Sequence, residues 1–136
     1  MSFFGNLLGG RARKCAPVSI PTVAGGTGAD DLMREELVMI FKHSTSCPVS
    51  WAAHSQVSRF LQDSPEAPVR MVSVIKERPL SQQIAAATGV RHESPQLIVL
   101  RRGEVLATAS HGEINRERLE IMFQNAAGVV PASVIR

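Results

Sequence analysis

An uninterrupted apolar run, Leu37–Phe41, is the feature that most constrains how this chain folds. Such runs are typical of strands buried on both faces, which occur in sheets that helices cover from both sides. Pro48 suits the first position of a helix, and apolar residues recur after it at helical spacing. A second apolar stretch, 69–75, follows a proline-containing loop over 64–68. Strand, helix and strand in this order predict a right-handed crossover between two parallel strands.

The second half of the chain predicts a helix, a hairpin and a closing helix. The pattern indicates a helix from Pro79 to a stop at Gly89, strands over 96–101 and 104–110, and a last helix from a cap at Asn115 to Gly128. A tight turn at Arg102-Gly103 joins the two strands, and we expect this hairpin to add antiparallel strands at the edge of the sheet. The predicted fold class is therefore α/β, with a four-stranded mixed sheet flanked by helices.

One folded domain accounts for most of the chain, because 136 residues suffice for a single hydrophobic core. Glycines and prolines interrupt any periodicity in residues 1–29, which predicts a flexible N-terminal tail. The domain is expected over 30–128, beginning with a short helix that Asp30 or Asp31 caps. Residues 129–136 contain a proline and are expected to form a C-terminal tail.

Composition and charge argue against several classes of function. The net charge is +3, but basic and acidic residues are interleaved, and aromatic residues make up only 4% of the chain. Neither a basic patch nor a set of stacking platforms is indicated, so we expect no nucleic-acid partner. No apolar stretch approaches the ~20 residues of a membrane span, and the start lacks the features of a secretory signal. We therefore expect a cytoplasmic protein without a membrane partner.

Cys47 lies between the first strand and the first long helix, directly before Pro48. A cysteine in the first turn of a helix faces unpaired backbone N–H groups and the positive end of the helix dipole, and both stabilise a thiolate. Its neighbours 44–46 and Ser50 are polar, which argues against a buried, inert cysteine. A structural disulfide between the chain's two cysteines is not expected in a reducing compartment. We predict that Cys47 is a redox-active nucleophile, in the strand–cysteine–helix order of thioredoxins.

Several neighbours of Cys47 admit two interpretations each. Ser50 occupies the position of the second cysteine in dithiol thioredoxins, and its hydroxyl either donates a hydrogen bond to the Cys47 thiolate or bonds its own helix backbone. Since Ser50 cannot close a disulfide, the expected mechanism is monothiol. Trp51 either lines the rim beside the cysteine or packs in the core. Lys42 and His43 either add positive potential near the sulfur or lie in water at the end of the strand.

No bound metal is expected, because a zinc site built from His43, Cys47 and His54 matches no familiar ligand spacing. Cys15 lies in a basic stretch, residues 11–15, whose charges favour a thiolate. It is either a resolving thiol that reaches Cys47 or an incidental cysteine, and the sequence leaves both interpretations open.

Two stretches of the chain resemble the monothiol bacilliredoxins, thioredoxin-like proteins of the bacillithiol system. They are KHSTSCPVS at 42–50 and SPQLIVLRRGEVLATASHGEI at 94–114, and their separation is similar as well. The resemblance covers roughly residues 30–128. Ser46, directly after Thr45, is a small departure from the family's pattern that leaves the nucleophile in place.

The resemblance implies a thioredoxin-like fold and a specific reaction. Cys47 would attack a mixed disulfide between a protein and bacillithiol and take the small thiol onto itself. The implied partners are bacillithiolated proteins and this low-molecular-weight thiol, which is a substrate, and no resident cofactor is implied. Pro95 would be a cis-proline facing the cysteine, with the Ser94 backbone ready to pair with an extended substrate. The substrate-binding residues would be Thr45, Trp51, Ser94 and Pro95, and the supporting residues Ser46, Pro48 and Ser50.

Two functions of other classes stay open. A thioredoxin-fold binding module would grip extended peptides with residues 94–100 without turnover, and its partner binding would survive Cys47→Ser. An iron–sulfur carrier would bridge a cluster between two subunits through monothiol Cys-x-x-Ser sites, and it would be coloured after anaerobic purification.

Overall fold

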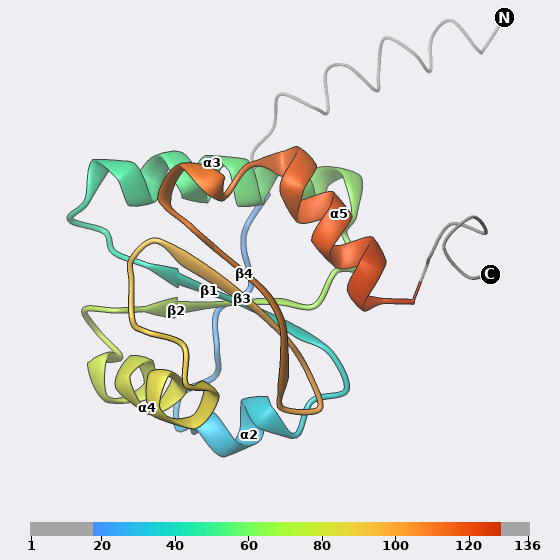
Figure 1. Cartoon of the computed structure of the whole chain (residues 1–136). Helices are drawn as coiled ribbons and strands as arrows, with labels where there is room; N and C mark the ends of the chain where they lie inside the picture. The colour runs from blue at the N-terminus through green and yellow to red at the C-terminus, as the bar shows by residue number, and fades with distance from the viewer. Residues whose placement is uncertain (1–17, 129–136) are drawn as a thin grey trace, which may run out of the picture.

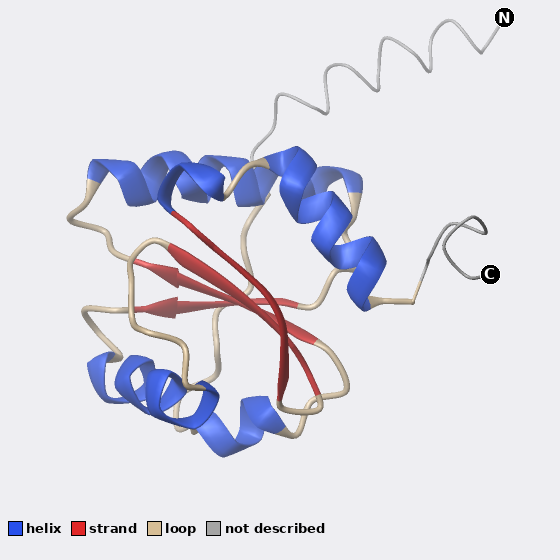
Figure 2. Ribbon diagram, in the orientation of Figure 1, coloured by secondary structure: helices blue, strands red, loops and turns tan. Residues whose placement is uncertain are grey.

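The structure is a computed structural model that describes residues 18–128 of the chain. Its elements are α2 (Ala29–Met33), β1 (Val38–His43), α3 (Pro48–Asp63), β2 (Val69–Ser73), α4 (Arg78–Thr88), β3 (Gln96–Arg101), β4 (Glu104–Ser110), the short 3₁₀ helix η1 (His111–Glu113) and α5 (Arg116–Ala126). A four-stranded mixed sheet in the order β2-β1-β3-β4 forms the centre (Figure 1). Figure 2 shows helices on both sides of it, α3 and α5 on one face and α2 and α4 on the other. The predicted α/β class is confirmed.

The apolar run forms β1, in which every residue from Val38 to His43 is buried. β1 pairs in parallel with β2 and antiparallel with β3, so the predicted strand–helix–strand crossover is confirmed. The strand does not end at Phe41, as the apolar run indicated. It continues through Lys42 and His43, whose side chains are also buried.

The hairpin differs from the prediction in the position of its first strand. β3 pairs with β1 on one side and with β4 on the other, so only β4 lies at the edge of the sheet. Leu97–Leu100 are apolar at consecutive positions and completely buried, whereas the residues of β4 alternate in exposure. A strand that is apolar on both faces is stabilised by an inner position, where both faces are covered.

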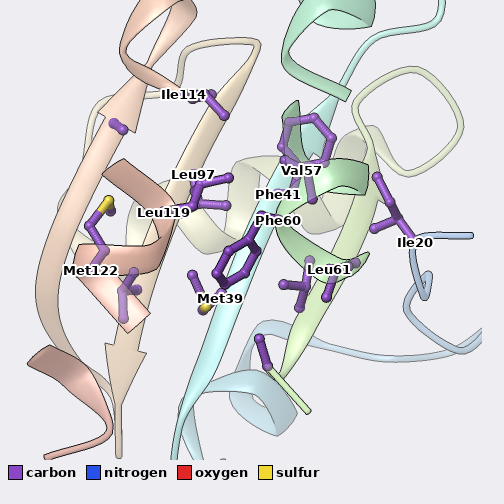
Figure 3. Close-up of a cluster of buried hydrophobic side chains, with 14 of the residues drawn as sticks. Ile20, Met39, Phe41, Val57, Phe60, Leu61, Leu97, Ile114, Leu119 and Met122 are labelled. Carbon is purple, nitrogen blue, oxygen red and sulfur yellow. The ribbon is translucent and has the colours of Figure 1, made fainter. Parts of the chain in front are cut away.

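Two hydrophobic clusters fill the space between the sheet and its helices. The cluster beneath α3 and α5 includes Met39 and Phe41 (Figure 3). The cluster on the opposite face includes Ile40 and side chains of α2 and α4. Because side chains alternate along a strand, His43 continues the first face and Lys42 the second. The two polar residues at the end of β1 therefore lie on opposite sides of the sheet.

Residues 18–28 belong to the folded domain, which corrects the prediction of a tail up to residue 29. The Met71 N–H of β2 donates to the carbonyl of Pro21 at 2.7 Å, and the Val23 N–H donates to the Met71 carbonyl at 3.1 Å. Ile20 and Val23 are buried. This extended segment covers the outer edge of β2. The sequence did not predict this contact, because a segment that forms only a few backbone hydrogen bonds with one strand needs no periodic pattern of apolar residues.

Parts of the predicted tails lie outside the described residues. These are residues 1–17 and 129–136, and Cys15 is among them. The resolving role considered for Cys15 therefore stays a prediction.

Most predicted helix and turn signals are confirmed, with one exception. Gly89 ends α4 with a φ of 74°, and the Asn115 side chain accepts a hydrogen bond from the Arg118 N–H at 2.9 Å. The predicted aspartate cap of α2 is wrong, because the residue before the helix is Gly28. Asp31 lies inside the first turn and accepts a hydrogen bond from the Gly28 N–H at 2.9 Å.

Candidate active site

Cys47 is the residue immediately before α3, and Pro48 begins the helix as predicted. A tight turn holds it, in which the Cys47 N–H donates to the carbonyl of Ser44 at 3.3 Å. The Cys47 carbonyl accepts from the N–H groups of Ser50 at 3.0 Å and Trp51 at 3.2 Å, and the side chain forms no capping hydrogen bond. Cys47 is partly exposed and lies at the positive end of the α3 dipole.

The Ser50 hydroxyl has partners that the sequence did not indicate. It lies beneath the turn, completely buried, and its oxygen accepts a hydrogen bond from the Ser44 N–H at 2.9 Å. The same oxygen lies 2.7 Å from Nδ1 of His43. Within residues 18–128 it therefore bonds neither the Cys47 sulfur nor its own helix backbone, the two partners considered above.

His43 is buried in a group of aromatic rings, which corrects the expectation that it lies in water or adds charge. Its ring stacks on Phe41 with centroids 5.6 Å apart, meets Trp51 edge-on at 4.6 Å and lies 4.9 Å from His54. Burial, and to a smaller degree the neighbouring His54, lowers the pKa of His43, so its imidazole is neutral near pH 7. Its Nε2 atom is buried and has no hydrogen-bond partner among the described residues.

Trp51 forms part of the rim around the cysteine. Its side chain is 47% exposed, so the interpretation as core packing is wrong. The indole N–H donates to the carbonyl of Thr45 at 2.9 Å, which fixes the ring against the turn. Thr45, Ser46 and Pro48 are exposed, and the Ser46 hydroxyl lies 3.1 Å from that of Ser44. The surface around the sulfur is therefore open to a substrate on the side of the turn.

The Ser94–Pro95 peptide bond is cis, as the resemblance implied. It directly precedes β3, whose first residue, Gln96, pairs with Lys42 near the end of β1. The peptide therefore lies at the same end of the sheet as Cys47. The Pro95 carbonyl accepts a hydrogen bond from the His111 N–H at 3.1 Å, and the Ser94 hydroxyl is buried without a partner among the described residues.

Comparison with known proteins identifies the family. The sequence matches the family model of monothiol bacilliredoxin BrxC over residues 28–119. The chain belongs to this family. The matched range contains the Cys47 turn, Ser50 and the Ser94–Pro95 peptide, and it confirms the resemblance seen in the sequence.

Solved structures confirm the thioredoxin-like fold. A protein described as an inferred oxidoreductase with a thioredoxin fold is 34% identical, with a TM-score of 0.62, and the match covers 68% of this chain and 83% of that one. Reduced thioredoxin 2 from Pseudomonas aeruginosa PAO1 is 19% identical with a TM-score of 0.64, over 83% and 100% of the two chains. Reduced desulfothioredoxin from Desulfovibrio vulgaris Hildenborough is 17% identical with a TM-score of 0.61, over 79% and 97%. The last two show a common fold alone.

In this member of the BrxC family, Lys42 lies away from the cysteine, on the face covered by α4. Its side chain is completely buried, and Nζ donates to the carbonyl of Ser81 at 3.0 Å and lies 3.1 Å from Nδ1 of His92. Burial lowers the pKa of Lys42 to about 8. The expectation that Lys42 lies in water or near the sulfur is therefore wrong, because the strand alternation turns it to the opposite face.

A cavity of about 300 Å³ opens beside the Cys47 turn. His43 and Thr45 line it together with residues of the N-terminal segment, β2 and the loop after β2, among them Thr22, Met71, Ser73 and Lys76. Its lining combines hydroxyl groups and the His43 ring with two apolar side chains, Val23 and Met71, and it carries one cation, Lys76, and one carboxylate, Glu77. It offers room for a small polar molecule or part of one.

The described residues contain no metal-binding group. Between residues 18 and 128, no three histidine, cysteine or acidic side chains are placed to hold a metal ion. His43 and His54 pack against each other as rings, and the His43 Nδ1 atom is directed to Ser50.

Proposed function

We propose that this protein is a monothiol thiol–disulfide oxidoreductase that removes bacillithiol from protein mixed disulfides. The observation that carries the proposal is Cys47, partly exposed at the N-terminus of α3 with Ser50 in place of a second cysteine. Membership of the BrxC family supports a thiol redox role. We infer bacillithiol as the small thiol from that membership, as a substrate and not as a resident cofactor.

The first step is attack by the Cys47 thiolate on the bacillithiol sulfur of the mixed disulfide. A bond forms between the two sulfurs, the original S–S bond breaks, and the protein substrate leaves as a thiolate with the electron pair. A second bacillithiol, also as a thiolate, then attacks the bacillithiol sulfur held on Cys47. This step releases the disulfide of two bacillithiol molecules and regenerates the Cys47 thiolate. A second thiol is required from elsewhere because the Ser50 hydroxyl cannot form a disulfide.

Cys15 is the internal alternative to this second thiol. A resolving Cys15 would form a disulfide with Cys47 and release bacillithiol directly. Mass spectrometry after mild peroxide treatment tests it: a peptide joining Cys15 and Cys47 supports the internal route, and its absence removes it.

We assign the substrate contacts to the exposed rim of the Cys47 turn. Thr45 and Trp51 would meet the protein substrate on one side, and the Ser94 backbone would pair with an extended segment beside Pro95. The partners are then bacillithiolated proteins and the low-molecular-weight thiol. Among residues 18–128, no helix has the length and apolar character needed to cross a bilayer. We propose a cytoplasmic location, where thiols stay reduced.

Removal of the nucleophile tests the proposal directly. A protein carrying bacillithiol in a mixed disulfide is incubated with the wild-type chain and with Cys47→Ser, and released bacillithiol is measured. We expect release by the wild type and none by the variant, while Glu66→Gln, an exposed change in the loop between α3 and β2, keeps most of the release. Equal release by Cys47→Ser would contradict the proposal. Partner binding without any release by either chain would favour the peptide-binding module.

We propose that the carboxylate-bearing part of bacillithiol binds in the cavity beside the Cys47 turn. Lys76 supplies the cation in its lining, which also contains the hydroxyls of Thr22 and Ser73. The one carboxylate of the lining, Glu77, already accepts a hydrogen bond from the Ser73 N–H at 3.1 Å. We predict that Lys76→Glu raises KM for bacillithiol about tenfold with little change in the alkylation rate of Cys47, since one charge-assisted contact is lost and repulsion is added. An unchanged KM would place the small thiol elsewhere.

A further inference from the structure

The loop between α4 and β3, residues 89–95, contains neither helix nor strand and ends in the cis Ser94–Pro95 peptide. A segment without regular backbone pairing keeps one conformation only through contacts with the elements around it. The proposed reaction pairs the Ser94 backbone with the protein substrate. The position of that backbone therefore depends on the side chains that hold the loop.

Lys42 of β1 contacts the loop through His92. Its buried Nζ atom lies 3.1 Å from Nδ1 of His92 and donates to the carbonyl of Ser81 on α4 at 3.0 Å. With a pKa of about 8, Lys42 is mostly an ammonium at pH 7, and an ammonium only donates. The Nδ1 atom of a neutral His92 therefore accepts this hydrogen bond, and the ring carries its proton on Nε2. This charge-assisted contact holds the ring, and with it the loop, at the end of β1.

Gln96, the first residue of β3, holds the loop from the neighbouring strand. It is 2% exposed and is the partner of Lys42 in the β1–β3 ladder, so the two side chains lie next to each other on the same face of the sheet. Its Nε2 atom donates to the Arg91 carbonyl at 2.8 Å, and its Oε1 atom accepts from the Glu93 N–H at 3.4 Å. The loop residues directly before Ser94 are thus bonded to two buried side chains of the sheet.

Packing alone does not account for these two polar side chains. The next residues on the same face, Ile40 and Ile98, are partners in the same ladder and belong to the hydrophobic cluster beneath α2 and α4. Apolar residues at positions 42 and 96 would extend that cluster, whereas an ammonium and an amide lose their hydration when they are buried. Such exceptions to apolar packing are expected at functional sites.

The order of the strands places this loop and the cavity beside the Cys47 turn on opposite sides of β1. The turn follows β1, the cavity is lined by residues of β2 and of the N-terminal segment, and the loop leads into β3. A mixed disulfide at Cys47 with its small thiol in the cavity would therefore extend its protein part toward the loop.

We propose that Lys42, His92 and Gln96 are positioning residues for the protein part of the substrate: they hold residues 91–93 so that the Ser94 backbone is fixed for pairing with an extended segment. The inference rests on the proposed function, since it takes a bacillithiolated protein as the substrate. It requires no contact between the three side chains and the cysteine. Loss of the contacts therefore weakens binding of the protein substrate and leaves the nucleophile unchanged.

Variants of His92 give the first test, because this residue is exposed. His92→Leu removes the acceptor for Lys42, and His92→Asn keeps a side-chain oxygen that can accept. KM and kcat are measured with a bacillithiolated protein and with the mixed disulfide of bacillithiol and mercaptoethanol. We expect His92→Leu to raise KM for the protein about fivefold with kcat within about twofold, and to leave both constants for the small disulfide unchanged. His92→Asn should recover most of the wild-type KM.

Lys42→Met and Gln96→Leu give the second test, from the side of the sheet. Each should raise KM for the protein about as much as His92→Leu, and Lys42→Met combined with His92→Leu should raise it no further, because both remove the same contact. Gln82→Leu, an exposed change on α4, is the matched control for Gln96→Leu and should keep the wild-type KM. Urea unfolding of each chain distinguishes a raised KM from a loss of folded protein.

An unchanged KM for the protein in both His92→Leu and Lys42→Met overturns the inference, and so does an equal rise for the small disulfide. Amide hydrogen exchange gives a measurement that is independent of activity. We expect Glu93 and Ser94 to exchange about fivefold faster in His92→Leu, and unchanged exchange there overturns the inference as well. A wild-type chain that releases no bacillithiol from either substrate counts against the proposed function instead, so the two failures are distinguishable.

Discussion

Lys42 and His43 are neighbours in the sequence, but their side chains are buried on opposite faces of the sheet. His43 bonds Ser50 beneath the cysteine turn, and Lys42 bonds the Ser81 carbonyl of α4. The charged form of each side chain is better solvated in water than in the protein interior. Burial therefore lowers the pKa of both and favours the neutral form. At the scale of single residues, the end of β1 therefore couples proton binding to folding.

Replacement of the buried lysine tests this for Lys42. The pKa of Lys42 is about 8 in the folded chain, below its ordinary value of 10.5. Below pH 8 the folded state must hold a buried cation, and a shift of this size corresponds to a cost of about 3 kcal/mol. We predict that Lys42→Met raises the free energy of unfolding by up to about 3 kcal/mol at pH 7. The gain should shrink between pH 8 and 10.5, as the wild-type lysine loses its proton.

Urea unfolding at pH 7 and at pH 10 measures this difference. Lys76→Met is the matched control, since Lys76 is exposed, and it should change the free energy of unfolding little at either pH. A Lys42→Met chain that is less stable than the wild type at pH 7 would show that the hydrogen bond to Ser81 outweighs the cost of burial.

Acid should destabilise the protein through His43, which is buried, and His54, which is partly buried. Burial lowers the pKa of both His43 and His54 from 6.5, so the unfolded chain binds more protons than the folded one below about pH 6.5. We predict that Tm falls as the pH drops from 6.5, and that it falls less steeply in His54→Phe. Differential scanning calorimetry between pH 5 and pH 7.5 gives both slopes. A Tm independent of pH over that range is the contrary result.

At the scale of elements, the hairpin turn between β3 and β4 depends on backbone conformations that few residues adopt. Arg102 and Gly103 have φ angles of 49° and 84°. A Cβ atom at Gly103 would also lie 3.3 Å from the carbonyl oxygen of Met33, at the end of α2. The turn therefore needs glycine both for its left-handed conformation and for the close approach of α2.

We predict that Gly103→Ala lowers the free energy of unfolding by about 1–2 kcal/mol, the usual cost of a left-handed residue that has a side chain. Gly112→Ala is the control, because a Cβ atom there meets nothing within 4 Å. Chemical denaturation of both variants makes the comparison. Equal stability of the two would show that the turn relaxes without cost.

At the scale of the whole molecule, the N-terminal segment completes the sheet. Residues 18–28 pair with the outer edge of β2 and place Ile20 in the cluster beneath α3 and α5, where Figure 3 shows it beside Leu61. The same segment supplies Thr22 to the cavity beside the cysteine turn. One side of the cavity wall is therefore complete only when this segment is bound to β2.

Truncation of Ile20 tests how strongly this segment is bound. Its side chain is 6% exposed, so we predict that Ile20→Ala lowers the free energy of unfolding by about 2–3 kcal/mol. Ala24→Ser, an exposed change in the same segment, should have little effect. Thermal unfolding followed by circular dichroism measures both. A loss near zero for Ile20→Ala would mean that the segment is held by its backbone hydrogen bonds alone.

Local patterns in the sequence determined most of the elements and the position of the cysteine. The apolar runs 37–41 and 96–101, the prolines at helix starts and the glycine at the end of α4 act through neighbouring residues, so they identify strands, helices and turns without tertiary contacts. The position of Cys47, directly before the proline that begins α3, was predicted from such a local pattern. The cis peptide bond before Pro95 was predicted from the resemblance to the family.

Tertiary structure alone decided which polar groups are buried and which atoms they contact. The inner position of β3, the covering of β2 by residues 18–28, and the partners of Lys42 and Ser50 all depend on contacts between residues far apart in the chain. No local pattern carries that information, because burial of a polar side chain is stabilised only by partners that folding brings to it. The pairing of His43 with Ser50 beneath the Cys47 turn is one of these contacts.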